Sequence, residues 1–342
     1  FIGTYGNRWA NYALGTCDWL LVLGSRLDLR QTGSDTESFM KGKQIFHVDI
    51  DNAELNNRFY GCKTLNAELS DFLNRANTHV ISGKDKNEWF TPDNVRLALE
   101  SIAGELTPGN LGAWTEKYPG LQAVGKPLSI GVVMAGNIPL AGFHDLLCVL
   151  ISGNRIVART SSKDPDIMVW IADLLVSLEP SFRDLIIFRN DRLCDFDAVI
   201  ATGSDNTSRY FEYYFGKYPN IIRKNRNSVS IIDGSENESD LAAMGEDIFS
   251  YFGLGCRNIS KIFVPEGYDL NMLSSQWRAY SNIICHKKYA NNYDFSKAVF
   301  IVNREPFTDT GYLLMKESTA LSSPVAVLFY EKYRTREEVI QH

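Results

Sequence analysis

The sequence predicts an α/β protein made of three successive units, and three observations lead to this expectation. Apolar segments of strand type alternate with helical patterns along most of the 342 residues, as in parallel sheets with helical crossovers. Residues 76–88 are polar and carry Gly, Asn and Ser, a composition typical of a domain boundary. A cysteine preceded by two glycines lies within 251–260, between a helical pattern and an apolar strand. We therefore expect a small unit at residues 1–78, a dinucleotide-binding domain at 88–232 and a catalytic domain at 233–342.

Composition narrows the classes of function. With 44% hydrophobic residues the chain can bury a sizeable core, and a net charge of −6 with a pI near 5.5 argues against nucleic acid as the main partner. No window of the sequence approaches a membrane span. The six cysteines are scattered, without the spacing of a zinc site, so no metal site is predicted. A reducing cytoplasm is the expected location.

The first unit is predicted to be a small Rossmann-like, three-layer α/β domain. Trp19–Leu23 is an apolar run of buried-strand type, and Gln44–Asp49 is a second such strand. A helical pattern over Leu65–Leu73 is expected to complete the unit. Strands separated by helices predict a parallel sheet, and the loops that follow such strands often bind nucleotides.

The second unit repeats the β-α-β pattern and is predicted to be doubly wound. A helix is expected to begin at Thr202, Gly203 and Ser204. The unit has no GxGxxG motif, so a nucleotide phosphate is expected to meet the backbone N–H groups of this helix start. The other expected strands and helices are Leu128–Met134, Leu140–Ile151, Arg155–Arg159, Asp166–Leu178, Leu185–Phe188 and Phe196–Ala201.

Cys256 is the candidate nucleophile of the third unit. Gly253 and Gly255 precede it and permit a tight turn that can bring the thiol close to a substrate. The thiolate of such a cysteine can attack a carbonyl carbon. The alternative is a buried structural cysteine, because free cysteines are among the most buried residues. The motifs that accompany this turn favour the nucleophile.

Four segments of the first unit carry a family resemblance: Gly6–Asn11, Asp18–Arg26, Arg30–Gly33 and His47–Asp51. In this order they resemble the middle domain of thiamine-diphosphate enzymes of the acetolactate synthase type, over residues 1–75. The family's cofactor-activating glutamate and metal-diphosphate motif belong to flanking domains, so no tight binding of thiamine diphosphate is expected. Some members hold FAD in this domain, so Arg26 and Arg30 could contact a nucleotide. Solvated or salt-bridged arginines are the alternative.

Six short motifs of the other two units carry a second resemblance: Gly131–Leu140, Gly153-Asn154, Ser161–Pro165, Ala201–Ser204, Arg223–Ser228 and Gly253–Asn258. In this order they resemble the aldehyde dehydrogenase superfamily over residues 86–342. More closely, they are similar to the acyl-CoA reductases of the LuxC type, which make aldehydes from fatty acyl thioesters. The resemblance implies an aldehyde-dehydrogenase-like doubly wound domain and an α/β catalytic domain. The superfamily continues beyond the point that matches His342, so we expect a C-terminally truncated catalytic domain, and a homo-oligomer only if the missing segment is present.

The second resemblance implies roles for individual residues. Cys256 matches the family's catalytic nucleophile. Asn137 matches the asparagine that donates to the oxyanion, and its alternative is a turn residue before Ile138-Pro139. The remaining matches lie at the cofactor: the pyrophosphate turn at Thr202, Gly203 and Ser204, and the adenosine-ribose positions Arg159 and Ser162.

One departure from the family bears on the reaction. The hydrolytic dehydrogenases carry a glutamate general base in the segment Arg223–Ser228, where this sequence has no carboxylate. That base activates the water that releases an acid, and an enzyme that exchanges CoA on the cysteine does not need it. The missing glutamate therefore favours reduction of acyl-CoA over oxidation of aldehydes to acids.

The cofactor-ribose segment favours NADPH. Arg159 and Lys163 bracket three hydroxyl side chains, and Ser162 stands where the family commonly has a glutamate. An acid there holds the ribose 2′-hydroxyl and repels a 2′-phosphate, whereas cations and hydroxyls suit the phosphate. The expected function is NADPH-dependent reduction of a fatty acyl-CoA to an aldehyde through an acyl group on Cys256. The alternatives are a fragment of a thiamine-dependent carboligase or decarboxylase, and a non-catalytic fusion or scaffold.

Overall fold

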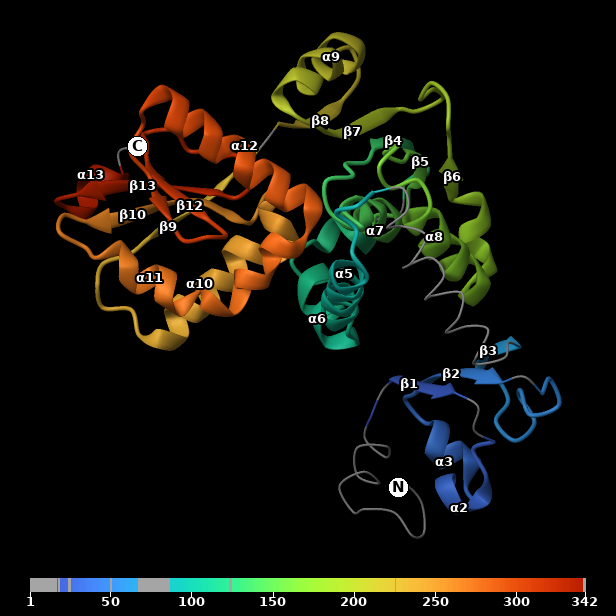
Figure 1. Cartoon of the computed structure of the whole chain (residues 1–342). Coiled ribbons are helices and arrows are strands. Elements are labelled where there is room, and N and C mark those ends of the chain that lie inside the picture. The colour runs from blue at the N-terminus through green and yellow to red at the C-terminus, as the bar shows by residue number, and fades with distance from the viewer. Residues whose placement is uncertain are drawn as a thin grey trace.

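The computed structural model describes residues 17, 19–23, 26–49, 51–66, 87–122, 125–224 and 226–340. Within these ranges the protein has three separate sheets with helices between the strands, which confirms the predicted α/β class. Figure 1 shows the sheets succeeding one another along the chain, from the blue strands near the N-terminus to the orange and red strands near the C-terminus.

The N-terminal sheet has three parallel strands in the order β1 (Trp19–Leu23), β2 (Gln44–Asp49) and β3 (Lys63–Asn66). The first two match the predicted strands. Leu65 and Asn66, which were expected to begin a helix, instead pair with β2, and the rest of that expected helix lies outside the described residues. The short helices between β1 and β2 are α2 (Leu29–Thr32) and α3 (Thr36–Met40). The small core consists of Val22, Leu27, Ile45, Phe59 and Cys62.

The second sheet has five parallel strands in the order β6-β5-β4-β7-β8. From the central β4 the chain winds outward to β6, then crosses to β7 and β8 on the other side, which confirms the doubly wound prediction. The loops after β4, β5 and β7 therefore meet at one edge of the sheet. The strands are β4 (Ser129–Val133), β5 (Arg155–Arg159), β6 (Ile186–Phe188), β7 (Ala198–Thr202) and β8 (Asn220–Arg223). The helices are α5 (Pro92–Glu105), α6 (Pro108–Thr115), η1 (Pro119–Gln122), α7 (Phe143–Ile151), α8 (Ile167–Leu178), η2 (Pro180–Asp184) and α9 (Asp205–Phe215).

The third sheet has five strands in the order β11-β12-β13-β10-β9, all parallel except for the β11–β12 pair. Its core is made of apolar side chains from these strands and the helices that cover them, with Trp277 fully buried. The strands are β9 (Ser228–Ile231), β10 (Ile259–Pro265), β11 (Thr308–Asp309), β12 (Leu314–Glu317) and β13 (Val327–Tyr333). The helices are α10 (Glu238–Phe249), η3 (Ser250–Gly253), α11 (Leu270–Gln276), η4 (Arg278–Cys285), α12 (Lys287–Asn303) and α13 (Arg336–Ile340).

The chain passes from the second sheet to the third between Arg223 and Ser228. The expected boundary at residue 232 assigned β9 to the dinucleotide-binding domain. In the structure β9 pairs in parallel with β10, with Ser230 opposite Ile262, so it belongs to the third sheet. The polar segment between β8 and β9 is therefore the passage between the two sheets.

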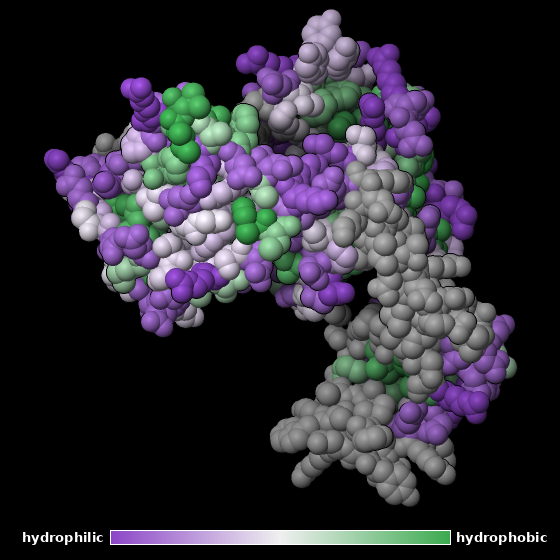
Figure 2. Space-filling model, in the orientation of Figure 1, coloured by the Kyte–Doolittle hydropathy of each residue, from purple (hydrophilic) through white to green (hydrophobic). Residues whose placement is uncertain are grey.

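Helix α12 presents different residues to the core and to solvent. Tyr289, Tyr293 and Phe300 are buried on one side. Phe295 and Val302 are exposed on the other side, and green hydrophobic residues gather over this helix in Figure 2. None of the helices in the described ranges is long and apolar enough to cross a membrane.

Candidate active site

Cys256 lies on an exposed turn between α10 and β10. Just before it, three successive residues have left-handed backbone conformations: Tyr251 with φ 52°, Phe252 with φ 60° and Gly253 with φ 74°. Two of these residues have side chains, for which this conformation is strained. Strain of this kind persists only where neighbouring contacts hold the backbone, so other residues must fix the turn.

The buried side chain of Asn258 fixes the turn from within. Its Nδ2 donates to the carbonyl oxygens of Asp247 at 2.7 Å and Ser250 at 2.9 Å, and its Oδ1 accepts from the Gly255 N–H at 2.7 Å. Each such bond contributes about 1 kcal/mol. One amide therefore ties the end of α10 to the glycine before Cys256 and offsets part of the strain.

Asn137 connects the second sheet to the same turn. It lies in the loop after β4, and its Nδ2 donates to the carbonyl oxygen of Leu254 at 2.8 Å. An amide nitrogen carries two hydrogens, so this bond leaves a second N–H that can donate to a substrate oxygen. The predicted nucleophile and the predicted oxyanion donor thus come from different sheets and meet where these sheets are joined.

The loop that carries Asn137 ends at another strained residue, Leu140, with φ 57°. The carboxylate of Asp164 accepts from the Leu140 N–H at 3.4 Å, while its other oxygen has no hydrogen-bond partner among the described residues. Burial raises the pKa of Asp164 from an ordinary 3.8 to about 6, and the nearby charge of Asp166 contributes in the same direction.

We expect the Asp164 carboxylate to reduce stability progressively as the pH rises from about 4 to 6. The folded state binds this proton more tightly than the unfolded state does, so ionisation in this window favours unfolding. Asp164→Asn keeps an acceptor for Leu140 and removes the charge. Its free energy of unfolding should match wild type near pH 4 and exceed it by about 2 kcal/mol at pH 7. Urea unfolding at both pH values measures this difference, and a variant less stable than wild type at pH 7 would show that the charge is needed.

The predicted cofactor residues lie at the carboxyl edge of the second sheet. Arg159 is the last residue of β5 and Thr202 the last of β7, on either side of the central β4. Ser162 and Lys163 follow β5 in an exposed turn. Winding reverses between β4 and β7, and nucleotides bind at such a reversal in open parallel sheets.

The loop after β4 lies directly against the loop after β5. A Cβ placed on Gly136 would be 2.4 Å from Ser161 Oγ, so only glycine fits this contact. Ser161 Oγ also accepts from the Lys163 N–H at 3.2 Å. The loop that carries Asn137 is thereby held against the turn that carries the candidate cofactor residues.

The start of α9 fits a phosphate group. Ser204 caps this helix, with its Oγ accepting from the Thr207 N–H at 3.4 Å. Thr202 Oγ1 is buried and makes no hydrogen bond within the described part of the chain. The N–H groups of a helix N-terminus attract anions, and the Thr202 hydroxyl has a donor to offer. The three residues Thr202, Gly203 and Ser204 are thus suited to hold a cofactor pyrophosphate.

A pocket of about 750 Å³ includes Cys256 in its wall. Glu246, Asp247 and Arg257 are its charged residues close to the thiol in sequence. A pocket of this size, mostly apolar and with a few polar groups, suits a small molecule with a long apolar portion. The apolar wall comes from α5, α6, α7 and the loop before α7, with Leu97, Ala98, Ile102, Leu106, Leu111, Trp114, Ile138, Pro139, Leu140, Phe143 and Leu147.

An ion pair that the sequence did not predict links α7 to β8. Arg223 Nη1 donates to both carboxylate oxygens of Asp145, at 2.6 Å and 2.8 Å. Asp145 is buried, and the Arg223 side chain is 30% exposed. Arg223 belongs to the segment in which hydrolytic aldehyde dehydrogenases carry their general base. The Asp145 carboxylate reaches this segment from α7, and both of its oxygens are bonded to the guanidinium.

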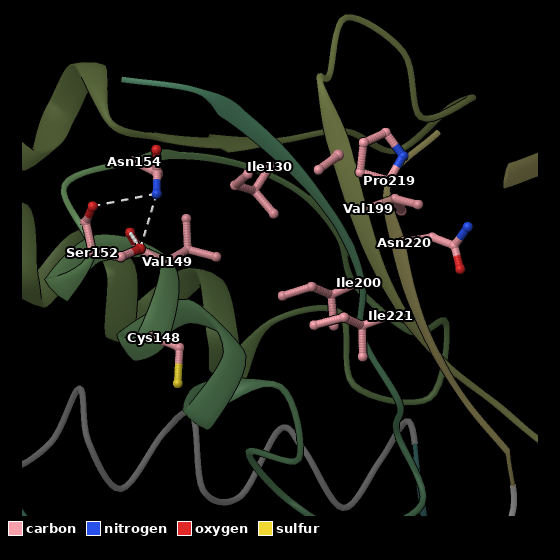
Figure 3. Close-up of a pocket in the computed structure, with 11 residues that line it drawn as sticks. Ile130, Cys148, Val149, Ser152, Asn154, Val199, Ile200, Pro219, Asn220 and Ile221 are labelled. Atoms are coloured by element: carbon pink, nitrogen blue, oxygen red, sulfur yellow. Dashed lines mark hydrogen bonds between the residues drawn. The ribbon is translucent and has the colours of Figure 1, made fainter. Parts of the chain in front are cut away.

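Figure 3 shows a second pocket, of about 360 Å³, at the opposite edge of the second sheet. Cys148 on α7 and Ile130, near the start of β4, line it. Burial and the charge of Asp145 raise the pKa of the Cys148 thiol, and Arg223 partly offsets this. Less thiolate forms at such a cysteine, so Cys148 serves as a control for Cys256. No group of three or more His, Cys, Asp and Glu side chains in the described ranges is placed to hold a metal ion.

Comparison with known proteins gives one resemblance for the N-terminal unit and another for the rest of the chain. Residues 1–75 match the family model of the thiamine pyrophosphate enzyme central domain. The acetolactate synthase isozyme 1 large subunit of Escherichia coli (strain K12) is 36% identical over 88 residues, which are 26% of this chain and 15% of the relative. The long-chain acyl-protein thioester reductase 2 of Photobacterium leiognathi is 25% identical over 195 residues, 51% of this chain and 40% of the relative. The chain therefore spans less than half the length of either relative.

Solved aldehyde dehydrogenases share the fold. The putative aldehyde dehydrogenase PutA from Anabaena variabilis superposes with a TM-score of 0.58 at 15% identity, over 80% of this chain and 69% of that one. The indole-3-acetaldehyde dehydrogenase AldA of P. syringae, a mutant in complex with NAD+ and IAA, gives a TM-score of 0.52 at 16% identity, over 63% and 53% of the two chains. Both resemblances stated from the sequence motifs are confirmed, as is the aldehyde-dehydrogenase-like fold.

Proposed function

We propose that this chain reduces a fatty acyl-CoA to the aldehyde with NADPH, through an acyl group carried on Cys256. The Cys256 thiolate attacks the thioester carbonyl, a new carbon–sulfur bond forms, and the bond to CoA breaks with CoA leaving as its thiolate. When bound, NADPH would supply the hydride to the carbonyl carbon of the acyl group. The carbon–sulfur bond to Cys256 then breaks, which releases the aldehyde and restores the thiolate. The reaction would take place in the cytoplasm.

The observation that carries the proposal is the position of the thiol. Cys256 is exposed on a turn that Asn258 fixes, in the wall of a large apolar pocket. Asn137 is bonded to the same turn and has an N–H to spare for the oxygen of a tetrahedral intermediate. The name of the Photobacterium relative, an acyl-protein thioester reductase, supports a long-chain acyl thioester as substrate.

Arg223 supports the proposal that the enzyme reduces acyl-CoA and does not oxidise aldehydes to acids with water. In the segment where a hydrolytic enzyme needs a free carboxylate, the structure has a guanidinium bonded to Asp145. Without the family's glutamate in this segment to activate water, an acyl group on Cys256 would persist until hydride or CoA reaches it.

Acyl-CoA-dependent oxidation of NADPH, with the aldehyde trapped and identified, tests the proposal. Wild type should consume one NADPH for each aldehyde released and should carry a labelled acyl group on Cys256 when NADPH is withheld. A protein that is never acylated by acyl-CoA of any chain length would overturn the proposed reaction.

Asn137→Ala should lower the rate of Cys256 acylation by roughly 10²-fold or more, because one donor to the developing oxyanion is lost. Single-turnover acylation with labelled acyl-CoA measures this rate. Urea unfolding of the same variant reports the loss of the bond to Leu254 separately. A near-normal rate would mean that Asn137 is only a turn residue.

NADPH should bind more tightly than NADH, and Arg159→Ala should weaken NADPH selectively. Arg159 and Lys163 place two cations at the carboxyl edge of the second sheet, where a ribose 2′-phosphate would lie. Fluorescence titration with each cofactor measures the two affinities. Arg96→Ala, which changes an exposed arginine on α5, is the matched control. Equal affinities for the two cofactors in wild type would refute the assignment.

For the N-terminal unit we propose no part in the reductase site. Residues 1–75 resemble a thiamine-enzyme domain, and the motifs that define thiamine chemistry belong to other domains of that family. A separate small unit of this kind is expected to be only marginally stable alone.

A further inference from the structure

Two consecutive residues of β10 bind the loop that joins β12 to β13, residues 318–326. Ser260 Oγ donates to the carbonyl oxygen of Leu321 at 2.7 Å. Lys261 Nζ donates to the carbonyl oxygen of Thr319 at 3.0 Å. Both bonds join backbone carbonyls of one loop to the strand that begins three residues after Cys256.

Lys261 is the largest charged side chain that the described core encloses completely. It is 1% exposed, pairs with Glu331 of β13, and lies 4.6 Å from the centre of the Phe263 ring. Enclosing an ammonium group is costly unless charge and hydrogen bonds compensate it. Glu331 supplies the charge, and the Thr319 carbonyl supplies a further acceptor, so the loop is part of what holds this cation.

The same loop is connected to the backbone of Cys256. Ser260 Oγ is also 3.4 Å from the carbonyl oxygen of Ser228, and Ser228 Oγ donates to the carbonyl oxygen of Cys256 at 3.3 Å. A chain of polar contacts therefore runs from Leu321 through Ser260 and Ser228 to the backbone carbonyl of Cys256. Displacing the loop would therefore disturb the start of β10 and the turn before it, which carries the Cys256 thiol.

We infer that Lys261 is a positioning residue, which anchors loop 318–326 and through it keeps Cys256 in its reactive position. The effect on acylation rests on the proposed function, whereas the anchoring of the loop does not. Lys261 does not line the pocket that contains Cys256, and its ammonium bonds to Thr319 of the loop and to Glu331 of the neighbouring strand, so it acts through these two elements.

Hydrogen exchange and acylation kinetics together test the inference. Lys261→Met should speed amide exchange in residues 318–323 and lower kcat for Cys256 acylation by roughly tenfold, with KM for acyl-CoA little changed. Because Lys261→Met removes the buried cation that pairs with Glu331, the double variant Lys261→Met/Glu331→Leu removes both charges and should fold while still releasing the loop. Lys261→Arg can donate to both partners and should restore slow exchange and kcat.

Lys297→Met, which breaks a pair with Asp309 in the same domain, is the matched control and should change neither readout. A double variant with wild-type loop exchange would overturn the anchoring role, and one with released loop but normal kcat would overturn the positioning role. If wild type itself is not acylated, the proposed function fails, and loop exchange alone decides whether Lys261 is an anchor.

Discussion

Cys256→Ser should abolish formation of a covalent acyl-enzyme from labelled acyl-CoA. An alcohol is far weaker as a nucleophile than a thiolate at neutral pH unless a base activates it. The segment Arg223–Ser228 contains no carboxylate, and Asp145, which reaches it from α7, is bonded to Arg223 through both oxygens. A serine on this turn would lack the activating base of that segment, and we expect label incorporation to fall below detection, as measured by mass spectrometry of the intact protein.

Cys148→Ser and Cys285→Ser are the matched controls and should retain acylation. Cys148 lines the pocket at the opposite edge of the second sheet, and burial raises the pKa of its thiol. Cys285 is exposed at the end of η4, outside the pocket that contains Cys256. An acylated Cys256→Ser protein, or a Cys148→Ser protein that loses the label, would show that another thiol is the nucleophile.

The repeated β-α-β pattern was enough to predict the doubly wound sheet. Strand and helix patterns are local features of the sequence. Because ligands bind at the carboxyl ends of parallel strands, residues that end such strands are expected at the binding site. Arg159 and Thr202 accordingly end neighbouring strands on either side of β4. The contact of Asn137 with the Cys256 turn follows from the same logic only once the second and third sheets are known to meet there.

Other features depend on side-chain contacts that no local pattern encodes. Asp145 and Arg223 are 78 positions apart, and no sequence motif contains both residues or indicates that they pair. The three bonds of Asn258 span a turn whose backbone is left-handed at three successive residues. The sequence suggests this conformation for Gly253, because it is a glycine, but not for Tyr251. The boundary was expected at residue 232, whereas strand pairing puts β9 in the third sheet.

The site draws on both sheets, so its geometry depends on the contacts that fix each loop. The loop with Asn137 is held by Ser161 against Gly136 and by Asp164 at Leu140. Helix α7 follows this loop directly, and the ion pair of Asp145 fixes α7 to the end of β8. Breaking that pair should therefore have a large effect on stability.

Asp145→Ala should lower the free energy of unfolding by about 2 to 3 kcal/mol, because it leaves the Arg223 guanidinium without its carboxylate. The loss stays below that of a fully enclosed pair since the Arg223 side chain is 30% exposed and water can reach it. Urea unfolding followed by the fluorescence of the tryptophans gives the measurement. Asp145→Leu with Arg223→Met replaces both charges by apolar groups and should recover most of the loss, to within about 1 kcal/mol of wild type. If Asp145→Ala alone were as stable as wild type, the pair would contribute nothing to holding α7 against β8. If the double variant were no better than Asp145→Ala, the loss would come from packing at Asp145, and an unpaired guanidinium would not be its cause.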